Sequence, residues 1–190
     1  MNVEIREETT SAMAEYGRVF IAFMVESQLR VQPLDNGLKG WSLVEEIVEP
    51  PYLKDYDANK EEGPARWLSR DTSNWSVFSA FQGSTRLGGA VVAWNTAGVN
   101  ILEGRDDLAC LWDIRIDPEY RRVGIGFELF AAVTEWVRAK GCRHLKVETQ
   151  NINVPPCHFY ARQGCELRTI HPGAYPELPD EVQVLWYKDL

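Results

Sequence analysis

One stretch of this chain constrains its fold more than any other. An apolar segment from Leu108 to Ile116 predicts a strand, and an amphipathic segment that ends near Lys140 predicts a helix. Between them lies Arg121-Arg122-Val123-Gly124-Ile125-Gly126. Glycines let the backbone approach a ligand closely, and the N–H groups of a first helical turn have no partner inside the helix. The turn therefore predicts an anion site, with Arg121 and Arg122 adding positive charge beside it.

The residue types around this turn limit which anion it could bind. No Lys-Ser or Lys-Thr pair follows the glycines, as a P-loop requires, and no third glycine completes a dinucleotide fingerprint. A glycine turn between a strand and a helix is also often only a tight connection. If the turn binds a ligand, the ligand is a phosphate held mainly by backbone amides.

Two motifs in the second half of the chain carry a family resemblance. Residues 117–126 resemble the acetyl-CoA signature of the general N-acetyltransferase (GNAT) superfamily: Gln or Arg, two residues, Gly, one residue, then Gly or Ala. Asn153, Tyr160 and Gly164 occupy the offsets of that family's second motif. Pro156 and Cys165 stand where the motif has Ala and Phe. Proline is tolerated in a first helical turn, and a small apolar cysteine suits a packed position.

The resemblance implies a fold and a donor. The implied fold is α/β (α+β): a single mixed, mostly antiparallel sheet of about seven strands, splayed at the central pair and flanked by helices. The implied co-substrate is acetyl-CoA. The residues implied to bind it are Ile114, Arg115, Ile116, Arg121, Arg122, Val123, Gly124, Ile125, Gly126, Phe127 and Asn153.

Acetyl transfer to an amine requires a base for the ammonium proton and an acid for the departing thiolate. Tyr160 falls on the family position whose phenol commonly supplies the acid, although a tyrosine in a short helix is often only a core residue. Glu148 is the first candidate for the base, against the alternative of a charge on an exposed strand face. Asp113, on an apolar strand, is its rival, as either a functional or a paired structural group.

Length and composition favour one enzyme domain over residues 1–190. A chain of 190 residues that is 45% hydrophobic is long enough for one buried core and short for two. The first ten residues lack a basic leader and a long apolar run, and no stretch reaches bilayer length, so a cytoplasmic protein without membrane partners is expected. The oligomeric state is left open, with a homodimer as one alternative.

The cysteine spacing and the net charge argue against a metal ion and against nucleic acid as partners. Four cysteines, at 110, 142, 157 and 165, form no C-x-x-C pair, so neither zinc nor any other metal is expected, and reduced, mostly buried thiols are. A formal net charge of −8 argues against nucleic acid as a partner. From Glu45 to Glu62 seven carboxylates face two lysines. This acidic segment is either a solvated loop or a region that attracts a cationic amine.

The remaining elements follow from periodicity and turn residues. Strands are expected at 3–6, 40–48, 75–81, 87–94, 144–149, 166–171 and 182–188, and a loop at 95–107. Helices are expected at 11–29, from apolar residues at helical spacing, and at 155–162. In the helix after the glycine turn, the packed face should hold Phe127, Phe130, Ala131, Val133, Thr134 and Val137.

The acceptor is the least constrained feature. Residues 49–56, 148–151 and 185–187 resemble the streptothricin acetyltransferase branch, which implies a primary amine on a small cationic acceptor. Trp112 stands where that branch tends to carry a glutamate. The alternatives are acetylation of a protein N-terminus or lysine side chain, and a non-catalytic CoA-binding module.

Overall fold

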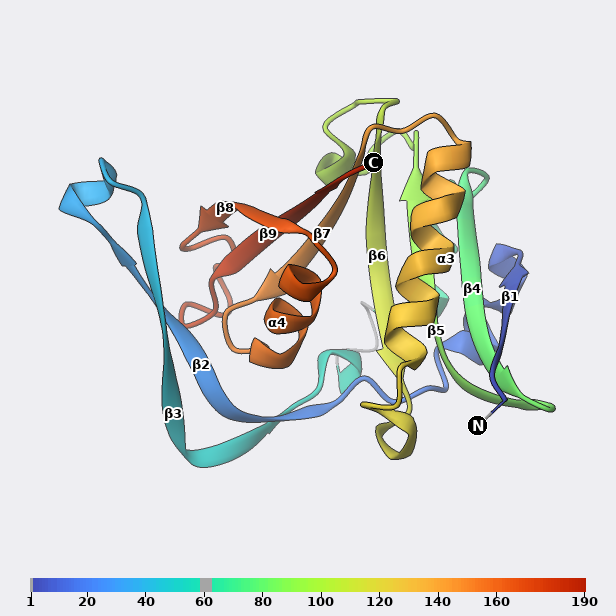
Figure 1. The fold of residues 1–190 in the computed structure, drawn as a ribbon, viewed down its shortest axis with the longest axis horizontal. Helices are drawn as coiled ribbons and strands as arrows, with labels where there is room; N and C mark the ends of the chain where they lie inside the picture. The colour runs from blue at the N-terminus through green and yellow to red at the C-terminus, as the bar shows by residue number, and fades with distance from the viewer. Residues whose placement is uncertain (1, 59–62) are drawn as a thin grey trace. The chain divides into compact units, whose positions relative to one another are not determined.

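The computed structural model describes residues 2–58 and 63–190, which divide into two compact units (Figure 1). The first unit comprises the chain up to Ala22, residues 55–146 and the last two residues. The second comprises Phe23–Lys54 and Val147–Lys188. The expectation of one domain stays a prediction, and each unit is described by itself.

The main sheet has seven strands in the order β1-β4-β5-β6-β7-β9-β8. β7 begins in the first unit and ends in the second. The pairs β1–β4, β4–β5, β5–β6 and β8–β9 are all antiparallel. A mostly antiparallel seven-stranded sheet flanked by helices confirms the expected fold class, whereas the splay at the central pair stays a prediction. The bounds are β1 Glu4–Glu8, β4 Trp75–Gln82, β5 Thr85–Trp94, β6 Leu108–Ile116, β7 His144–Gln150, β8 Glu166–His171 and β9 Gln183–Asp189.

The segment that follows β6 forms as predicted. A short turn of 3₁₀ helix at Pro118–Tyr120 leads to the glycine turn, and helix α3 spans Ile125–Ala139. α3 lies along β4, β5 and β6 (Figure 1). Its buried side chains are Ile125, Leu129, Phe130, Val133, Thr134 and Val137. Phe127 and Ala131 are exposed, so their assignment to the packed face was wrong. At the helix start the buried stripe runs through Ile125 and Leu129 instead.

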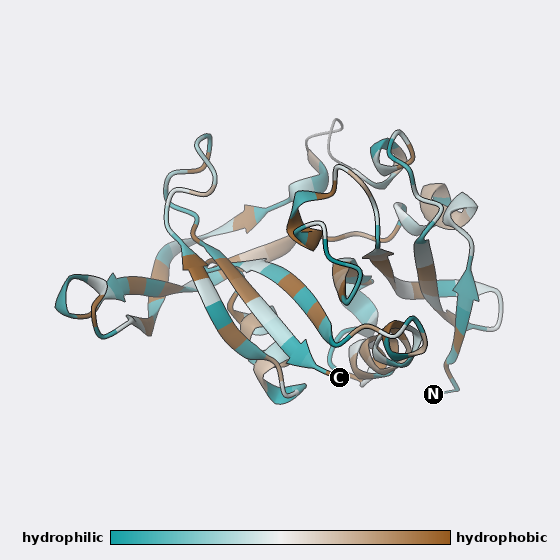
Figure 2. Cartoon of the chain, turned by 90° about the horizontal axis from the view of Figure 1, so that it is seen from above, coloured by the Kyte–Doolittle hydropathy of each residue, from teal (hydrophilic) through white to brown (hydrophobic). Residues whose placement is uncertain are grey.

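The core of the first unit lies between the sheet and short helical turns. Met13 and Tyr16, with no exposed surface, pack with Val77, Val91 and Cys110 of three neighbouring strands. Trp67, Trp75 and Trp112 join this cluster, and the Trp75 and Trp112 rings lie 4.9 Å apart. Figure 2 shows hydrophobic and hydrophilic residues alternating along the strands, as a sheet with distinct faces requires.

The long helix predicted for residues 11–29 is wrong. The chain forms a 3₁₀ turn at Thr10–Ala12 and a four-residue helix α1 at Met13–Tyr16, and it becomes strand β2 at Phe23–Pro33. Gly17 ends the helix and lies against Pro64, whose side chain would be 3.2 Å from a Cβ added there. Beyond Gly17 the chain is no longer helical, and Phe20 is 70% exposed.

Strands β2 and β3 form a long antiparallel hairpin in the second unit. β3 spans Trp41–Lys54, much longer than the predicted strand at 40–48. The first half of the acidic segment is therefore strand, and the expectation of a solvated loop is wrong there. Lys60, Glu61 and Glu62 lie outside the described residues.

The other elements match their expected positions within a few residues. Helix α4 spans Val154–Arg162, and Pro155 and Pro156 lie in its first turn, as anticipated for proline. Helix α2 is a single turn at Pro64–Trp67. Within the described ranges, none of the helices is both long and apolar enough to span a bilayer.

Candidate active site

The glycine turn exposes a row of backbone amides. Arg122 and Gly124 both have positive φ, 62° and 98°, which turns the chain sharply into α3. The amides of Phe127 and Glu128 donate to the carbonyl of Gly124. Over the described ranges, the amides of Val123, Gly124, Ile125 and Gly126 donate to no backbone carbonyl. These four residues, 123–126, are the amide cradle, and they present the donors that a phosphate group needs.

The side chain of Arg121 binds backbone carbonyls, and its role beside the phosphate stays a prediction. Its Nε donates to the carbonyl of Ile116 at 2.9 Å, and its terminal nitrogen donates to the carbonyls of Ala22 and Phe20 at 3.2 and 3.4 Å. Burial lowers the pKa of its guanidinium. Arg121 therefore ties the cradle to the end of β6, whereas the exposed Arg122 leaves its charge accessible.

Asp113 belongs to a buried network. Its Oδ2 accepts hydrogen bonds from the Tyr16 hydroxyl at 2.5 Å and from Arg115 Nε at 2.7 Å. Arg115, with a side chain only 1% exposed, also pairs with Asp57 at 2.6 Å and donates to the carbonyl of Val19. Burial and the charge of Asp113 raise the pKa of Tyr16 well above its ordinary value. The Asp113 carboxylate is thus paired, which was one of its two expected roles.

The backbone of Ile114, Arg115 and Ile116 pairs with β5 on one edge. Opposite them, Gly88 and Gly89 have no room for a side chain. A Cβ on Gly88 would lie 2.6 Å from the carbonyl oxygen of Arg115, and one on Gly89 would meet the Tyr16 ring. The role of residues 114–116 in holding the donor stays a prediction.

Glu148 lies on β7 and is partly buried. Its Oε1 accepts a hydrogen bond from the hydroxyl of Tyr175 at 2.6 Å, and that hydroxyl accepts one from Gln150 Nε2 at 3.0 Å. Burial, followed by the charge of Glu148, raises the pKa of Tyr175 above its ordinary range. Glu148 and Gln150 therefore reach the same group, because residues two apart on a strand share one face. Tyr175 was missed, since a tyrosine in a proline-rich loop gives no sequence signal.

Tyr160 and Asn153 belong to α4. Tyr160 is 2% exposed, and its carbonyl accepts from the amide of Cys165 where the helix ends. Asn153 precedes the helix with a non-helical backbone, and its side chain makes no capping bond. Gly164 has φ of 75°, a conformation that glycine adopts without strain. The two predicted functional side chains thus stand at the start and in the middle of the helix.

The sequence pattern of the Acetyltransferase (GNAT) family matches residues 41–165, which include the cradle and all of α4. The chain belongs to the GNAT acetyltransferase family. This confirms the resemblance and identifies the protein as an N-acetyltransferase.

One relative and two solved structures are similar to this acetyltransferase over almost its full length. Streptothricin acetyltransferase A of Bacillus subtilis is 26% identical over 192 residues, covering 96% of this chain and 98% of its own. The crystal structure of nourseothricin acetyltransferase matches with a TM-score of 0.77 and 23% identity, over 100% of this chain and 99% of its own. A protein of Bacillus anthracis assigned as a streptothricin acetyltransferase, solved with acetyl coenzyme A, has the same TM-score and identity and full coverage of both chains.

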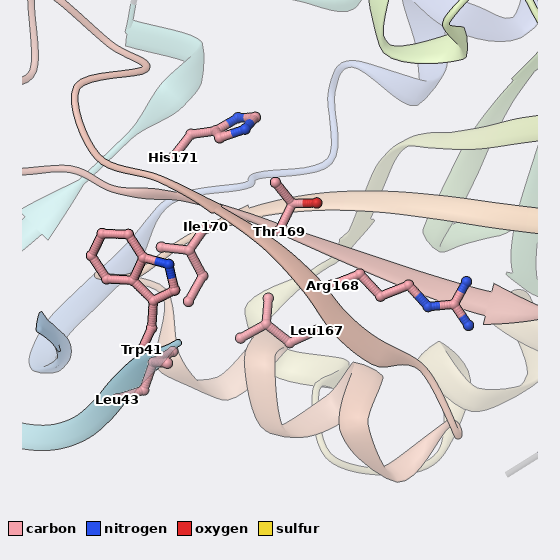
Figure 3. A pocket seen from close by; sticks show the side chains of 7 residues that line it. All are labelled: Trp41, Leu43, Leu167, Arg168, Thr169, Ile170 and His171. Atoms are coloured by element: carbon pink, nitrogen blue, oxygen red, sulfur yellow. The ribbon is translucent and has the colours of Figure 1, made fainter. Parts of the chain in front are cut away.

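One pocket of the acetyltransferase lies in the second unit (Figure 3). The start of β3 contributes Trp41 and Leu43, and β8 contributes residues 167–171. None of the residues predicted for the donor site or for catalysis lines it.

The four thiols of the acetyltransferase are free and buried, which confirms the expectation for the cysteines. Burial raises the pKa of Cys157 to about 11. Across residues 2–58 and 63–190, no group of three or more potential ligands could hold a metal ion.

Proposed function

We propose that this acetyltransferase moves the acetyl group of acetyl-CoA to a primary amine of a small cationic acceptor, with a streptothricin-like antibiotic as the leading candidate. The amide cradle is the observation that carries the donor assignment. The names of the related streptothricin acetyltransferases support the acceptor class.

The cradle suits the pyrophosphate of CoA. Four amides without backbone acceptors lie at the start of a fifteen-residue helix, where the helix dipole also favours negative charge. Arg122 supplies an accessible cation, while Arg121 fixes the turn. The thioester supplies the activated acetyl group, and residues of this chain position it and move the protons.

We assign the base to Glu148. Its Oε1 is held by Tyr175, and within the described ranges Oε2 accepts no hydrogen bond. An ionised carboxylate with one oxygen fixed and the other open can take the proton of an approaching ammonium. The amine then attacks the thioester carbonyl as a neutral nucleophile.

We assign the acid to Tyr160, whose phenol would protonate the departing thiolate. Support comes from its place in the second motif, between Asn153 and Gly164. Its burial on α4 also suits a proton donor that bulk water must not replace.

We assign Asp113 a structural role. One of its oxygens already accepts from two donors, and a neighbouring guanidinium stabilises its charge. Glu148 carries no such ion pair in the described part of the chain, which favours it over Asp113 as the base.

The acidic segment attracts cations less than its composition suggests. Glu46 pairs with Arg30 at 2.8 Å, Glu45 accepts from Ser27 at 2.7 Å, and Asp57 pairs with Arg115. Glu49 makes no ion pair with any described residue. We therefore attribute the attraction of a cationic acceptor mainly to the net charge of −8, which predicts rates that fall with added salt.

A panel of acceptors tests this proposal. Purified protein is incubated with acetyl-CoA and streptothricin, a linear polyamine, a lysine-containing peptide or a peptide with a free N-terminus, while free thiol is followed. We expect kcat/KM to be highest for streptothricin. A preference for either peptide would favour protein acetylation, and release of thiol with none of them would favour a CoA-binding module.

A further inference from the structure

We propose that Tyr175 is a positioning residue: its hydroxyl aims the carboxylate of Glu148 at the acceptor amine. This inference rests on the proposed function, because it takes Glu148 to be the base. Tyr175 lies on the loop between β8 and β9, outside every motif of the sequence.

The hydrogen-bond directions support this role. Gln150 Nε2 donates to the Tyr175 oxygen at 3.0 Å, which occupies one lone pair of the hydroxyl. The hydroxyl proton then points to Glu148 Oε1, 2.6 Å away. A hydrogen bond to a charged acceptor is stronger than a neutral one, so the carboxylate is held in one orientation. Oε2 is left to face the amine.

The loop that carries Tyr175 is fixed at several points within the second unit. The amide of Val182 donates to Asn151 Oδ1 at 2.7 Å, and the amide of Asn151 donates to the carbonyl of Val182 at 3.0 Å. Glu181, nearly buried, pairs with Lys54 of β3. Prolines at 172, 176 and 179 restrict the backbone between these contacts.

Tyr175 differs from its neighbours on the loop in its exposure to solvent. From Pro172 to Asp180 every residue except Tyr175 is exposed. A tyrosine needed only to cover the sheet would bury its ring and leave its hydroxyl to solvent. Tyr175 instead buries its hydroxyl against a carboxylate and an amide.

Four proteins test the inference: wild type, Tyr175→Phe, Glu148→Gln and the double variant. Turnover is measured at saturating acceptor, with KM for acetyl-CoA and the thermal midpoint alongside. We expect Tyr175→Phe to lower kcat about tenfold, the value of one hydrogen bond to a charged group, without changing KM for acetyl-CoA. Glu148→Gln should lower kcat about 100-fold.

The double variant is decisive. If Tyr175 acts through Glu148, adding Tyr175→Phe to the Glu148→Gln variant should not lower kcat further, because the two effects are not additive. A full additional tenfold loss, or an unchanged kcat in Tyr175→Phe, would overturn the inference. Normal turnover in Glu148→Gln would instead reject the base assignment itself.

Two further variants control for folding and for loss of a hydroxyl. Ser84→Ala removes a hydroxyl that makes no hydrogen bond with any described residue of this chain, from an exposed position in the turn between β4 and β5, and it should leave kcat unchanged. Gln150→Leu keeps both Tyr175 and Glu148 but removes one of the two glutamine side chains that hydrogen-bond to the hydroxyl, the other being Gln183. It should lower kcat about threefold. It therefore tests whether Tyr175 positions Glu148 even if Tyr175→Phe is unstable. Wild-type turnover in a folded Gln150→Leu would count against the inference.

Discussion

Tyr16 and Asp113 are hydrogen-bonded although 97 residues separate them in the sequence. The bond joins helix α1 to the central strand β6. Together with Arg115 and Asp57 it forms a largely buried network in which one guanidinium pairs with two carboxylates. Because of this pairing, we interpret the Asp113 carboxylate on β6 as a structural group.

Asp113→Asn should destabilise the protein more than it slows catalysis. The substitution leaves Arg115 buried with only Asp57 as an ionic partner, which should lower the free energy of unfolding by about 3 kcal/mol. Urea denaturation measures this loss. At a temperature where the variant is folded, kcat should stay within about threefold of wild type.

Asp106→Asn is the matched control for that substitution. Asp106 is exposed and forms no ion pair among residues 2–58 and 63–190, so its loss should change neither stability nor turnover. A fully stable Asp113→Asn protein with kcat reduced 100-fold would instead make Asp113 the base.

Gly124→Ala should weaken the donor site. Its φ of 98° is strained for alanine by about 1–2 kcal/mol, although no atom lies within 4 Å of the added Cβ. A shift of the turn removes at least one amide from the phosphate, so KM for acetyl-CoA should rise about tenfold. Steady-state kinetics at saturating acceptor measures it.

Gly98→Ala provides the comparison. Gly98 also has positive φ, 76°, and open space around its added Cβ, but it lies in the loop before β6. Both variants should lose similar stability. If Gly98→Ala raised KM for acetyl-CoA as much as Gly124→Ala, the effect would come from general destabilisation and not from the cradle.

Tyr160→Phe should slow the release of thiol. General acid catalysis contributes about 10²–10⁴-fold, so we expect kcat to fall at least 100-fold while the affinity for acetyl-CoA stays the same. Thiol release gives the rate, and calorimetric titration with CoA gives the affinity. Unchanged turnover would leave Tyr160 as a core residue.

The buried thiols predict a loss of stability at alkaline pH. Burial raises the pKa of Cys157 from 9.0 to about 11. Between these values the unfolded chain binds fewer protons than the folded one, so the free energy of unfolding falls as pH rises. The full effect for this residue is about 3 kcal/mol. Denaturation of wild type and Cys157→Ala at pH 8 and 10.5 should show a smaller fall in the variant; equal falls would contradict the prediction.

Local sequence signals predicted the elements that depend on local chemistry. The strand and the helix between Leu108 and Ala139 formed where predicted because an apolar strand, two glycines and an amphipathic pattern all agree there, although Phe127 and Ala131 were wrongly placed on the packed face. The helix predicted through Leu29 failed because its apolar spacing carried no information about Gly17 packing on Pro64 or about the pairing of β2 with β3.

The site was predictable only where a motif marks it. Asn153 and Tyr160 were predicted from their offsets in the second motif, and their roles, like that of Glu148, stay predictions. Tyr175 and Tyr16 were not found, because the loop and the helix that carry them meet their carboxylates only through tertiary structure. The bonds from the Arg121 side chain to carbonyls of its own unit were likewise not predictable, because they join segments far apart in the sequence.

Mass spectrometry of streptothricin after incubation with acetyl-CoA tests the central claim most directly. The account predicts that the antibiotic gains one acetyl group on a primary amine, that an equal amount of CoA thiol appears, and that Glu148→Gln slows both together. Unmodified streptothricin with intact acetyl-CoA, under conditions in which the protein is folded and binds CoA, would contradict it.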